Sequence, residues 1–237
     1  MLSARPWQGD VVIQFCGAQV LCFFFSLTMV GLLQKAGFAA FQPPDGSGAV
    51  LVATLGFQGV TWVLIPLFLR RHQMGWRDAF GIRDPRLLWV LGLTVILIPF
   101  VLLAAWGLEF LSGSVLAHFG RPPETQLTVS LLANARAGWM QVYLGVFAVV
   151  LAPVAEEFIF RGVLYPFIKQ QGYPRLAWFG VSFAFALVHN DVATLLPLFV
   201  LALVLTWLYE MTDNLLAPIA AHASFNAVNL AVIFFQK

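Results

Sequence analysis

Two neighbouring glutamates lie inside a long apolar stretch of the chain, where ionisable side chains are uncommon. Glu156 and Glu157 fall within the run 146–168, and Arg161 follows Glu157 by four positions. An ionisable side chain within a membrane span costs about 3 kcal/mol to insert, so such residues usually serve a function. Glu157 and Arg161 can form an ion pair on one helix face, whose alternative role is only to fix helix packing. Glu156 lies about 100° around the helix and is free to act as a general base.

Two histidines and an asparagine extend this set of polar residues to two further apolar runs. His189 ends one run, with Phe185 one helical turn before it, and His222 and Asn226 lie four positions apart near the start of the last run. Residues spaced by four share one face of a helix. An imidazole at His189 can relay a proton or orient water, and His222 and Asn226 can donate to a developing oxyanion. Together with Glu156, these residues predict a site that activates water for hydrolysis.

The same residue types also allow a metal site. Glu156, His189 and His222 resemble the ligands of a catalytic zinc ion that keeps one coordination position open. The spacing does not decide between metal-free hydrolysis and a divalent metal such as zinc. The sequence contains no His-Glu-x-x-His segment that would place two histidine ligands on a single helix.

The composition predicts that lipid is the solvent for most of the chain. Hydrophobic residues make up 60% of it and charged residues only 10%, with a mean hydropathy of +0.85. An ordinary soluble domain has about a quarter of its residues charged. The 13 basic and 11 acidic residues are too few to cover a soluble surface. The net charge of +2, without any block of like charges, gives no indication of nucleic-acid binding.

The apolar runs predict an all-α, polytopic bundle of about seven or eight transmembrane helices with an intramembrane polar cavity, because about 20 apolar residues cross a bilayer. A break at 189–191 leaves open whether the fifth and sixth runs are short spans, a re-entrant pair or helices with a broken middle. The expected spans lie near 11–33, 49–69, 87–111, 139–165, 176–192, 194–209 and 214–235.

An arginine-rich segment, 70–86, sets the predicted topology. It combines five arginines with Trp76 and Phe80, a composition typical of a segment that lies on an anionic inner leaflet. Because positive charge in short loops marks the cytoplasmic side, the N-terminus is expected inside and the proline-containing loop 112–137 outside. We therefore expect a multi-pass protein of the lipid bilayer, and a bacterial plasma membrane because no eukaryotic targeting feature is found.

Distances along the helices predict that the polar residues meet. At a rise of ~1.5 Å per residue, Glu156 lies ~15 Å, His189 ~21 Å and His222 ~14 Å from the inner ends of their helices. Consecutive helices run in opposite directions, so this similar depth does not follow from sequence order alone. It indicates one polar cavity that opens toward the cytoplasm.

Three short motifs give the chain a family resemblance. Residues 156–161 read Glu-Glu-x-x-x-Arg, residues 185–189 read Phe-x-x-x-His, and residues 222–226 read His-x-x-x-Asn. Each motif is weak alone, but the three in this order on successive helices are specific. The chain resembles the CAAX protease and bacteriocin-processing family, also called CPBP or Abi, whose eukaryotic branch is the Ras-converting endopeptidase. The resemblance covers roughly Val142 to Leu230.

The resemblance implies an intramembrane endopeptidase in a bundle of about eight helices. It divides the chain into N-terminal transmembrane helices with the basic loop, residues 1–137, and a catalytic transmembrane core, residues 138–237. It implies a membrane-associated peptide or protein as substrate, of which a prenylated one is the eukaryotic case. It favours a glutamate-dependent mechanism without a cofactor or catalytic metal.

The resemblance also implies roles for individual residues. Glu156 and His189 would activate water, and His222 and Asn226 would stabilise the oxyanion. The second glutamate and the arginine of the first motif, Glu157 and Arg161, would shape the site.

Two non-enzymatic readings of the same residues remain open. An immunity or scaffold protein would keep the fold and act by binding a partner. A proton-coupled transporter would use the buried glutamates and histidines as a relay, but no inverted repeat is visible in the sequence.

Other polar and aromatic residues are interpreted as structural. His72 and His118 fall in loop or interfacial segments and are interpreted as solvated. Asn190 and Asp191 either orient the neighbouring imidazole or begin a turn. Seven tryptophans are assigned to interfacial belts and lipid-facing surface: Trp62, Trp76, Trp89, Trp106, Trp139, Trp178 and Trp207.

Overall fold

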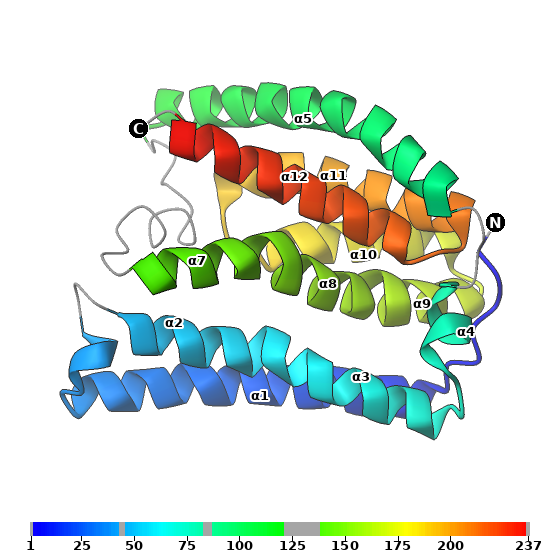
Figure 1. Ribbon diagram of the computed structural model, residues 1–237, viewed down its shortest axis with the longest axis horizontal. Helices are drawn as coiled ribbons and strands as arrows, with labels where there is room; N and C mark the ends of the chain where they lie inside the picture. Colours follow the sequence, from blue (N-terminus) through cyan, green and yellow to red (C-terminus); the bar gives the residue numbers. More distant parts are fainter. Residues whose placement is uncertain (1, 43–45, 83–86, 121–137, 236–237) are drawn as a thin grey trace.

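The computed structural model describes the whole chain except residues 1, 43–45, 83–86, 121–137 and 236–237, and every element in the described part is a helix (Figure 1). In this described part, six helical stretches are long and apolar enough to cross a membrane: Gly9–Lys35, Ser47–Arg71, Leu88–His118, Gly138–Gln170, Val192–Thr212 and Leu216–Ile233. The prediction of an all-α membrane bundle is confirmed.

The helices are arranged in layers (Figure 1). The first layer consists of α1 (Gly9–Lys35), α2 (Ser47–Thr54) and α3 (Val60–Arg71). The next contains the long helical stretch made of α7 (Gly138–Val146), α8 (Ala152–Glu157) and α9 (Tyr165–Gln170). Beyond it lie α10 (Pro174–Leu187), α11 (Val192–Thr212), α12 (Leu216–Phe235) and α5 (Leu87–His118).

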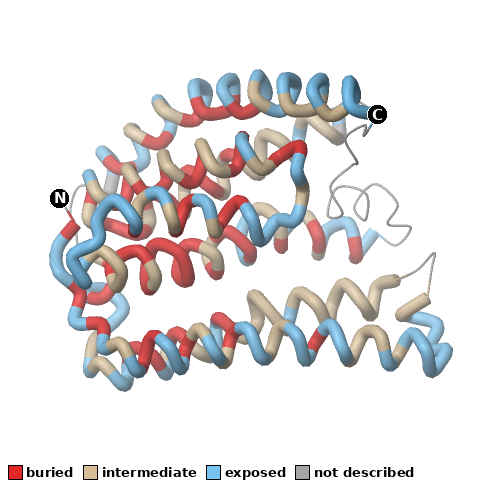
Figure 2. The backbone as a smooth tube through the Cα atoms, turned by 180° about the vertical axis from the view of Figure 1, so that it is seen from behind, coloured by how far each residue is buried: buried red, intermediate tan, exposed pale blue. Residues whose placement is uncertain are grey.

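Burial is uneven across these layers. Figure 2 shows that the buried residues are concentrated in the C-terminal helices, whereas many residues of α5 and α1 are exposed. The exposed residues of α1 and α5 include large apolar side chains, such as Leu21, Phe25, Val95, Phe100 and Phe110. Apolar side chains on the outside and polar ones inside are what a lipid solvent requires.

Within the described residues, two helical stretches contain three π-helical turns, which are wider than α-helical turns and are frequent at functional sites. The turn η2 (Leu55–Gly59) lies between α2 and α3, and η3 (Phe147–Leu151) and η4 (Phe158–Leu164) lie on either side of α8. In each turn, one backbone carbonyl accepts a hydrogen bond from a side chain of another segment: Phe57 from Gln19 at 2.6 Å, Ala148 from Asn226 at 2.8 Å and Gly162 from Trp7 at 2.9 Å.

The predicted spans correspond to helices, with two differences. The interrupted region resolves into the short α10 of 14 residues and the full-length α11, with 188–191 between them. The prediction that a loop begins at residue 112 is wrong, because α5 continues to His118. Within this last part of α5, the hydroxyl of Ser114 donates a hydrogen bond to the carbonyl of Phe110. The rest of the predicted loop, residues 121–137, lies outside the described residues.

The arginine-rich segment does not simply lie on a membrane surface. It forms the short helix α4 (Trp76–Phe80), and Phe80 has no exposed surface. The Phe80 ring packs against Phe158 at 4.9 Å, and its carbonyl accepts a hydrogen bond from the backbone N–H of Leu215 at 2.9 Å. The expectation for Phe80 is wrong because its ring fills the interior of the protein. Arg83 and Arg86 lie outside the described residues.

Candidate active site

A buried ion pair forms the base of the site. Arg161 Nη1 lies 3.0 Å from Glu157 Oε1, and both side chains are fully buried, which confirms the ion pair expected from their spacing. Arg161 also donates from Nη2 to the carbonyl of Ala202 at 2.9 Å and from Nε to the hydroxyl of Thr206 at 3.4 Å. Its guanidinium lies over the Phe185 ring, 4.7 Å from the centroid. Three helical stretches therefore hold this cation in one orientation.

The imidazole of His222 lies between the two neighbouring glutamates. Its Nδ1 is 2.9 Å from Glu157 Oε1, and its Nε2 is 3.9 Å from Glu156 Oε2. Glu157 is paired with the Arg161 guanidinium as a carboxylate and so can only accept, and Nδ1 of His222 must carry the proton. His222 is thereby oriented with Nε2 toward Glu156, at a distance too long for a direct hydrogen bond. The Glu156 side chain is 12% exposed, whereas that of Glu157 is fully enclosed.

His189 occupies the turn that follows α10 and is exposed. Its Nδ1 lies 2.8 Å from the carbonyl of Phe185, so Nδ1 donates and Nε2 is left as the acceptor in the neutral ring. The Phe185 ring lies 4.9 Å from the ring of His189 and 5.4 Å from that of His222. The structure thus brings both histidines against one buried phenylalanine. Within the described residues, His189 makes no ion pair with Glu156.

Asn226 projects from α12 toward the helical stretch that carries the glutamates. Its Nδ2 donates to Ala148 O at 2.8 Å, in the π turn η3 that precedes α8. An amide NH₂ has two hydrogens, so this bond leaves one donor of Asn226 available. Asn229, one turn further, instead bonds within its own helix to Phe225 O and accepts from the indole of Trp106.

The alternative prediction is that Glu156, His189 and His222 bind a metal ion. Among the residues that the structure describes, no group of three or more His, Cys, Asp or Glu side chains is arranged to hold a metal ion. Glu157 Oε1, the carboxylate oxygen nearest His222, is already shared with Arg161. A metal site of Glu156, His189 and His222 stays an alternative prediction.

The predictions for two residues outside the catalytic set, Asp191 and His72, had different outcomes. Asp191 caps α11 by accepting from the N–H of Ala193 at 2.9 Å, so the interpretation as a turn is the correct one. The interpretation of His72 as solvated is wrong, because its Nε2 accepts from the N–H of Gln8 at 2.9 Å and its ring packs against Trp7.

Trp7 contacts the helical stretch of the candidate site, although nothing in the sequence around it predicts that contact. It is 5% exposed and bonds to the residue that follows Arg161. A tryptophan just before a first membrane helix is typical of an interfacial anchor, and no local signal in the sequence identifies Gly162 as its partner.

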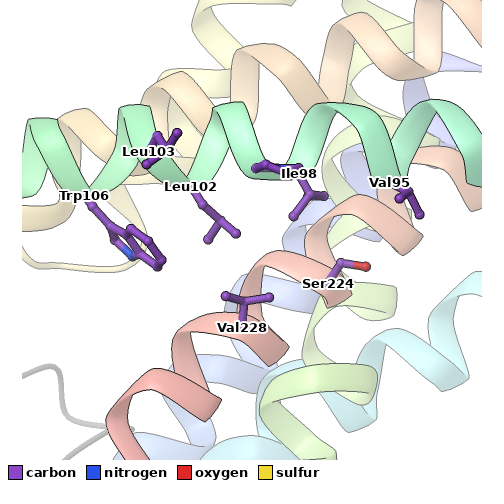
Figure 3. A pocket seen from close by; sticks show the side chains of 8 residues that line it. Val95, Ile98, Leu102, Leu103, Trp106, Ser224 and Val228 are labelled. Carbon is purple, nitrogen blue, oxygen red and sulfur yellow. The ribbon is translucent and has the colours of Figure 1, made fainter. Parts of the chain in front are cut away.

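An apolar groove lies between α5 and α12 (Figure 3). Its volume is about 450 Å³, and none of the candidate site residues is among those that line it. The lining residues are Val95, Ile98, Pro99, Leu102, Leu103, Trp106, Ser224 and Val228.

The candidate site lies within the part of the chain that matches a known protein family. Residues 138–228 match the family model described as "Type II CAAX prenyl endopeptidase Rce1-like". The UPF0177 protein YxdF of Lactococcus lactis subsp. lactis (strain IL1403) is 30% identical over 93 residues, which cover 37% of this chain and 51% of that protein. The "Putative membrane peptidase YdiL" of Bacillus subtilis (strain 168) is 25% identical over 216 residues, 87% of this chain and 82% of that protein.

The chain thus spans about half the length of the lactococcal relative. No solved structure matches the chain significantly. All three motifs, between Glu156 and Asn226, lie inside the matched residues, which confirms the resemblance that they carried. Residues 138–228 are therefore an Rce1-like region, and the described residues of the chain contain six candidate membrane spans.

Proposed function

We propose that this chain is an intramembrane endopeptidase that hydrolyses a peptide bond of a membrane-associated substrate. The observation that carries the proposal is the position of His222, whose two ring nitrogens face Glu157 and Glu156 inside an apolar helix bundle. Buried acid and base groups held in a fixed order are typical of sites that move protons.

Glu156 is the proton acceptor in this proposal. Its carboxylate is partly exposed, whereas that of Glu157 is fully buried and held by Arg161. Glu156 takes a proton from a water molecule whose other hydrogen is directed to the free Nε2 of His189. The water oxygen attacks the carbonyl carbon of the substrate, and Glu156 then passes its proton to the nitrogen of the departing amine.

His222 and Asn226 stabilise the negative charge that develops on the substrate oxygen. Asn226 offers the second hydrogen of Nδ2, because the first is bonded to Ala148. His222 donates through Nε2 in its doubly protonated form, while Glu157 fixes Nδ1. Donors that are already oriented before the reaction stabilise the charge without reorganisation.

The substrate in this proposal is a membrane-associated peptide or protein, and prenylated peptides are the first class to test because of the family description. The proposed mechanism needs no metal or other cofactor, and the proposed location is a bacterial plasma membrane, because both relatives come from bacteria.

The test is cleavage by purified protein in detergent, followed by mass spectrometry on a pool of prenylated and unmodified membrane-anchored peptides. Glu156→Gln and His189→Gln should each lower the rate by ~10²–10⁴-fold, the usual contribution of a general acid or base. Glu109→Gln removes an exposed carboxylate from α5, outside the matched region, and should leave the rate unchanged.

A chelator separates the two mechanisms. Activity that survives chelation supports the glutamate mechanism, and activity that is lost and then restored by zinc supports the metal site. Folded wild-type protein that cleaves no peptide in the pool would contradict the proposal and favour a binding role, as in an immunity or scaffold protein.

A further inference from the structure

The N-terminal segment reaches the helix that carries the glutamates. Trp7 lies before α1 and is 5% exposed. Its indole N–H donates to Gly162 O at 2.9 Å, a bond between segments 155 residues apart in the chain. The ring packs edge-on against Phe68 at 4.9 Å and against His72 at 5.0 Å, near the end of α3. Trp7 therefore links the α1–α3 layer to η4.

A second residue contacts Gly162 from α4. A Cβ atom added to Gly162 would lie 2.8 Å from Phe80 Cε1, closer than real Cβ contacts, so only glycine fits against this ring. The Phe80 ring cannot move away easily, because it is fully buried, packs on Phe158 and belongs to a residue whose carbonyl is bonded to Leu215. Trp7 and Phe80 both come from outside the matched residues 138–228.

Gly162 follows Arg161 directly within the π turn η4, which itself begins one residue after Glu157. The width of a π turn frees backbone groups from the regular ladder, and a freed carbonyl needs a partner. We propose that Trp7 and Phe80 are positioning residues of the site: by holding Gly162 from two sides, they set the register in which Arg161 meets Glu157.

The position of the Arg161–Glu157 pair also affects His222, because Glu157 Oε1 accepts hydrogen bonds from both Arg161 and the Nδ1–H of His222. A change in η4 would move this oxygen and change the hydrogen bond of the imidazole. The kinetic part of the inference rests on the proposed function. The structural part does not, since the state of the His222 ring can be observed without a substrate.

The experiment compares Trp7→Phe with Trp178→Phe. Both replace an indole by a phenyl ring, but Trp178 packs against the same core from α10 and serves as the control for lost ring volume. The first readout is the nitrogen NMR spectrum of ¹⁵N-histidine-labelled protein in detergent, with the His222 signal assigned by His222→Gln. The second is the separation of kcat from KM on a cleaved peptide.

Trp7→Phe should shift the His222 Nδ1 signal and lower kcat about five-fold with KM unchanged, the factor expected for one lost hydrogen bond. Trp178→Phe should match the wild type in both readouts. Phe80→Leu is the second variant, since it acts on Gly162 from the other side, and should shift the same signal.

An unchanged His222 signal in folded Trp7→Phe and Phe80→Leu would overturn the inference. Equal shifts in Trp7→Phe and Trp178→Phe would overturn it too, because they would report general loosening of the core. If the wild-type protein cleaves nothing, the proposed function fails, and the His222 signal alone decides whether Trp7 positions the pair.

Discussion

Arg161 and Glu157 are both fully buried and form an ion pair inside an apolar bundle. Taking two charges out of water costs several kcal/mol, which the pair offsets only when its remaining donors and acceptors are satisfied. Arg161 meets this condition through Ala202 and Thr206. Glu157 Oε1 also accepts from His222, so the pair does more than fix two helices.

Removing one member of this pair should be costly. Arg161→Met leaves a buried carboxylate without its cation and should lower the free energy of unfolding by about 3–5 kcal/mol. Glu157→Met combined with Arg161→Met should recover much of that loss, because no unpaired charge remains. Cleavage should stay absent in the double variant, since nothing then holds His222 Nδ1. Thermal unfolding in detergent, followed by tryptophan fluorescence, and the peptide assay measure the two effects. A double variant as unstable as the single one would contradict this account.

Asn226 and Asn229 offer a matched pair on one helix. Asn226→Ala should lower kcat by about 10²-fold or more with little change in KM, as expected when a donor to an oxyanion is lost. Asn229→Ala, whose amide bonds within its own helix, should stay within about three-fold of wild type. Steady-state kinetics of both variants provide the measurement. Similar losses in the two would mean that the effect comes from α12 packing and not from the oxyanion.

At the scale of elements, α4 is joined tightly to the turn between α11 and α12. Gly81 ends α4 with φ +69°, and a Cβ there would lie 1.6 Å from the carbonyl oxygen of Asp213. Asp213 itself has φ +50°. Both the left-handed backbone and the close approach require glycine at position 81.

Two glycine substitutions should therefore have opposite effects on stability. Gly81→Ala should lower the free energy of unfolding by at least about 2 kcal/mol, because the backbone of α4 must move away from Asp213. Gly107→Ala, in α5 with no neighbouring atom within 4 Å, should be neutral or stabilising by up to about 1 kcal/mol. Thermal unfolding of both proteins decides the point, and a Gly81→Ala protein as stable as wild type would show that this contact is not made.

At the scale of the whole molecule, the N-terminus and the connections after α3, α9 and α11 gather at one end of the bundle (Figure 1). Ion pairs tie this end together: Arg5 with Asp213, and Lys169 with Glu210, which also accepts from the hydroxyl of Tyr165. The positive charge of Arg5 and Lys169 predicts that this end faces the cytoplasm.

Cysteine labelling can test this orientation. With Cys16 and Cys22 replaced by serine, a single cysteine in place of the exposed Gln73 or Gln171 should react with a membrane-impermeant maleimide only in inverted vesicles. A cysteine in place of Gly37, at the other end of α1, should react in intact spheroplasts. Labelling of the Gln73 position from outside would reverse the proposed topology.

The sequence by itself determined the helices and the residues of the candidate site. Apolar runs of membrane-spanning length require helices, because lipid cannot satisfy a free backbone. A spacing of four placed Glu157 beside Arg161, and the structure confirms that pair. These are contacts within one helix, where a period of 3.6 residues fixes which side chains are neighbours.

Only the tertiary structure decided which helices face each other. It showed that Glu157, and not Glu156, binds Nδ1 of His222, and that Trp7 reaches Gly162 across 155 residues. It also showed that the Phe80 side chain is buried and that α5 extends to His118. Helical periodicity carries no information about the partner of a helix or about the register of a π turn. Those depend on how distant side chains pack, and that is fixed only once the bundle has assembled.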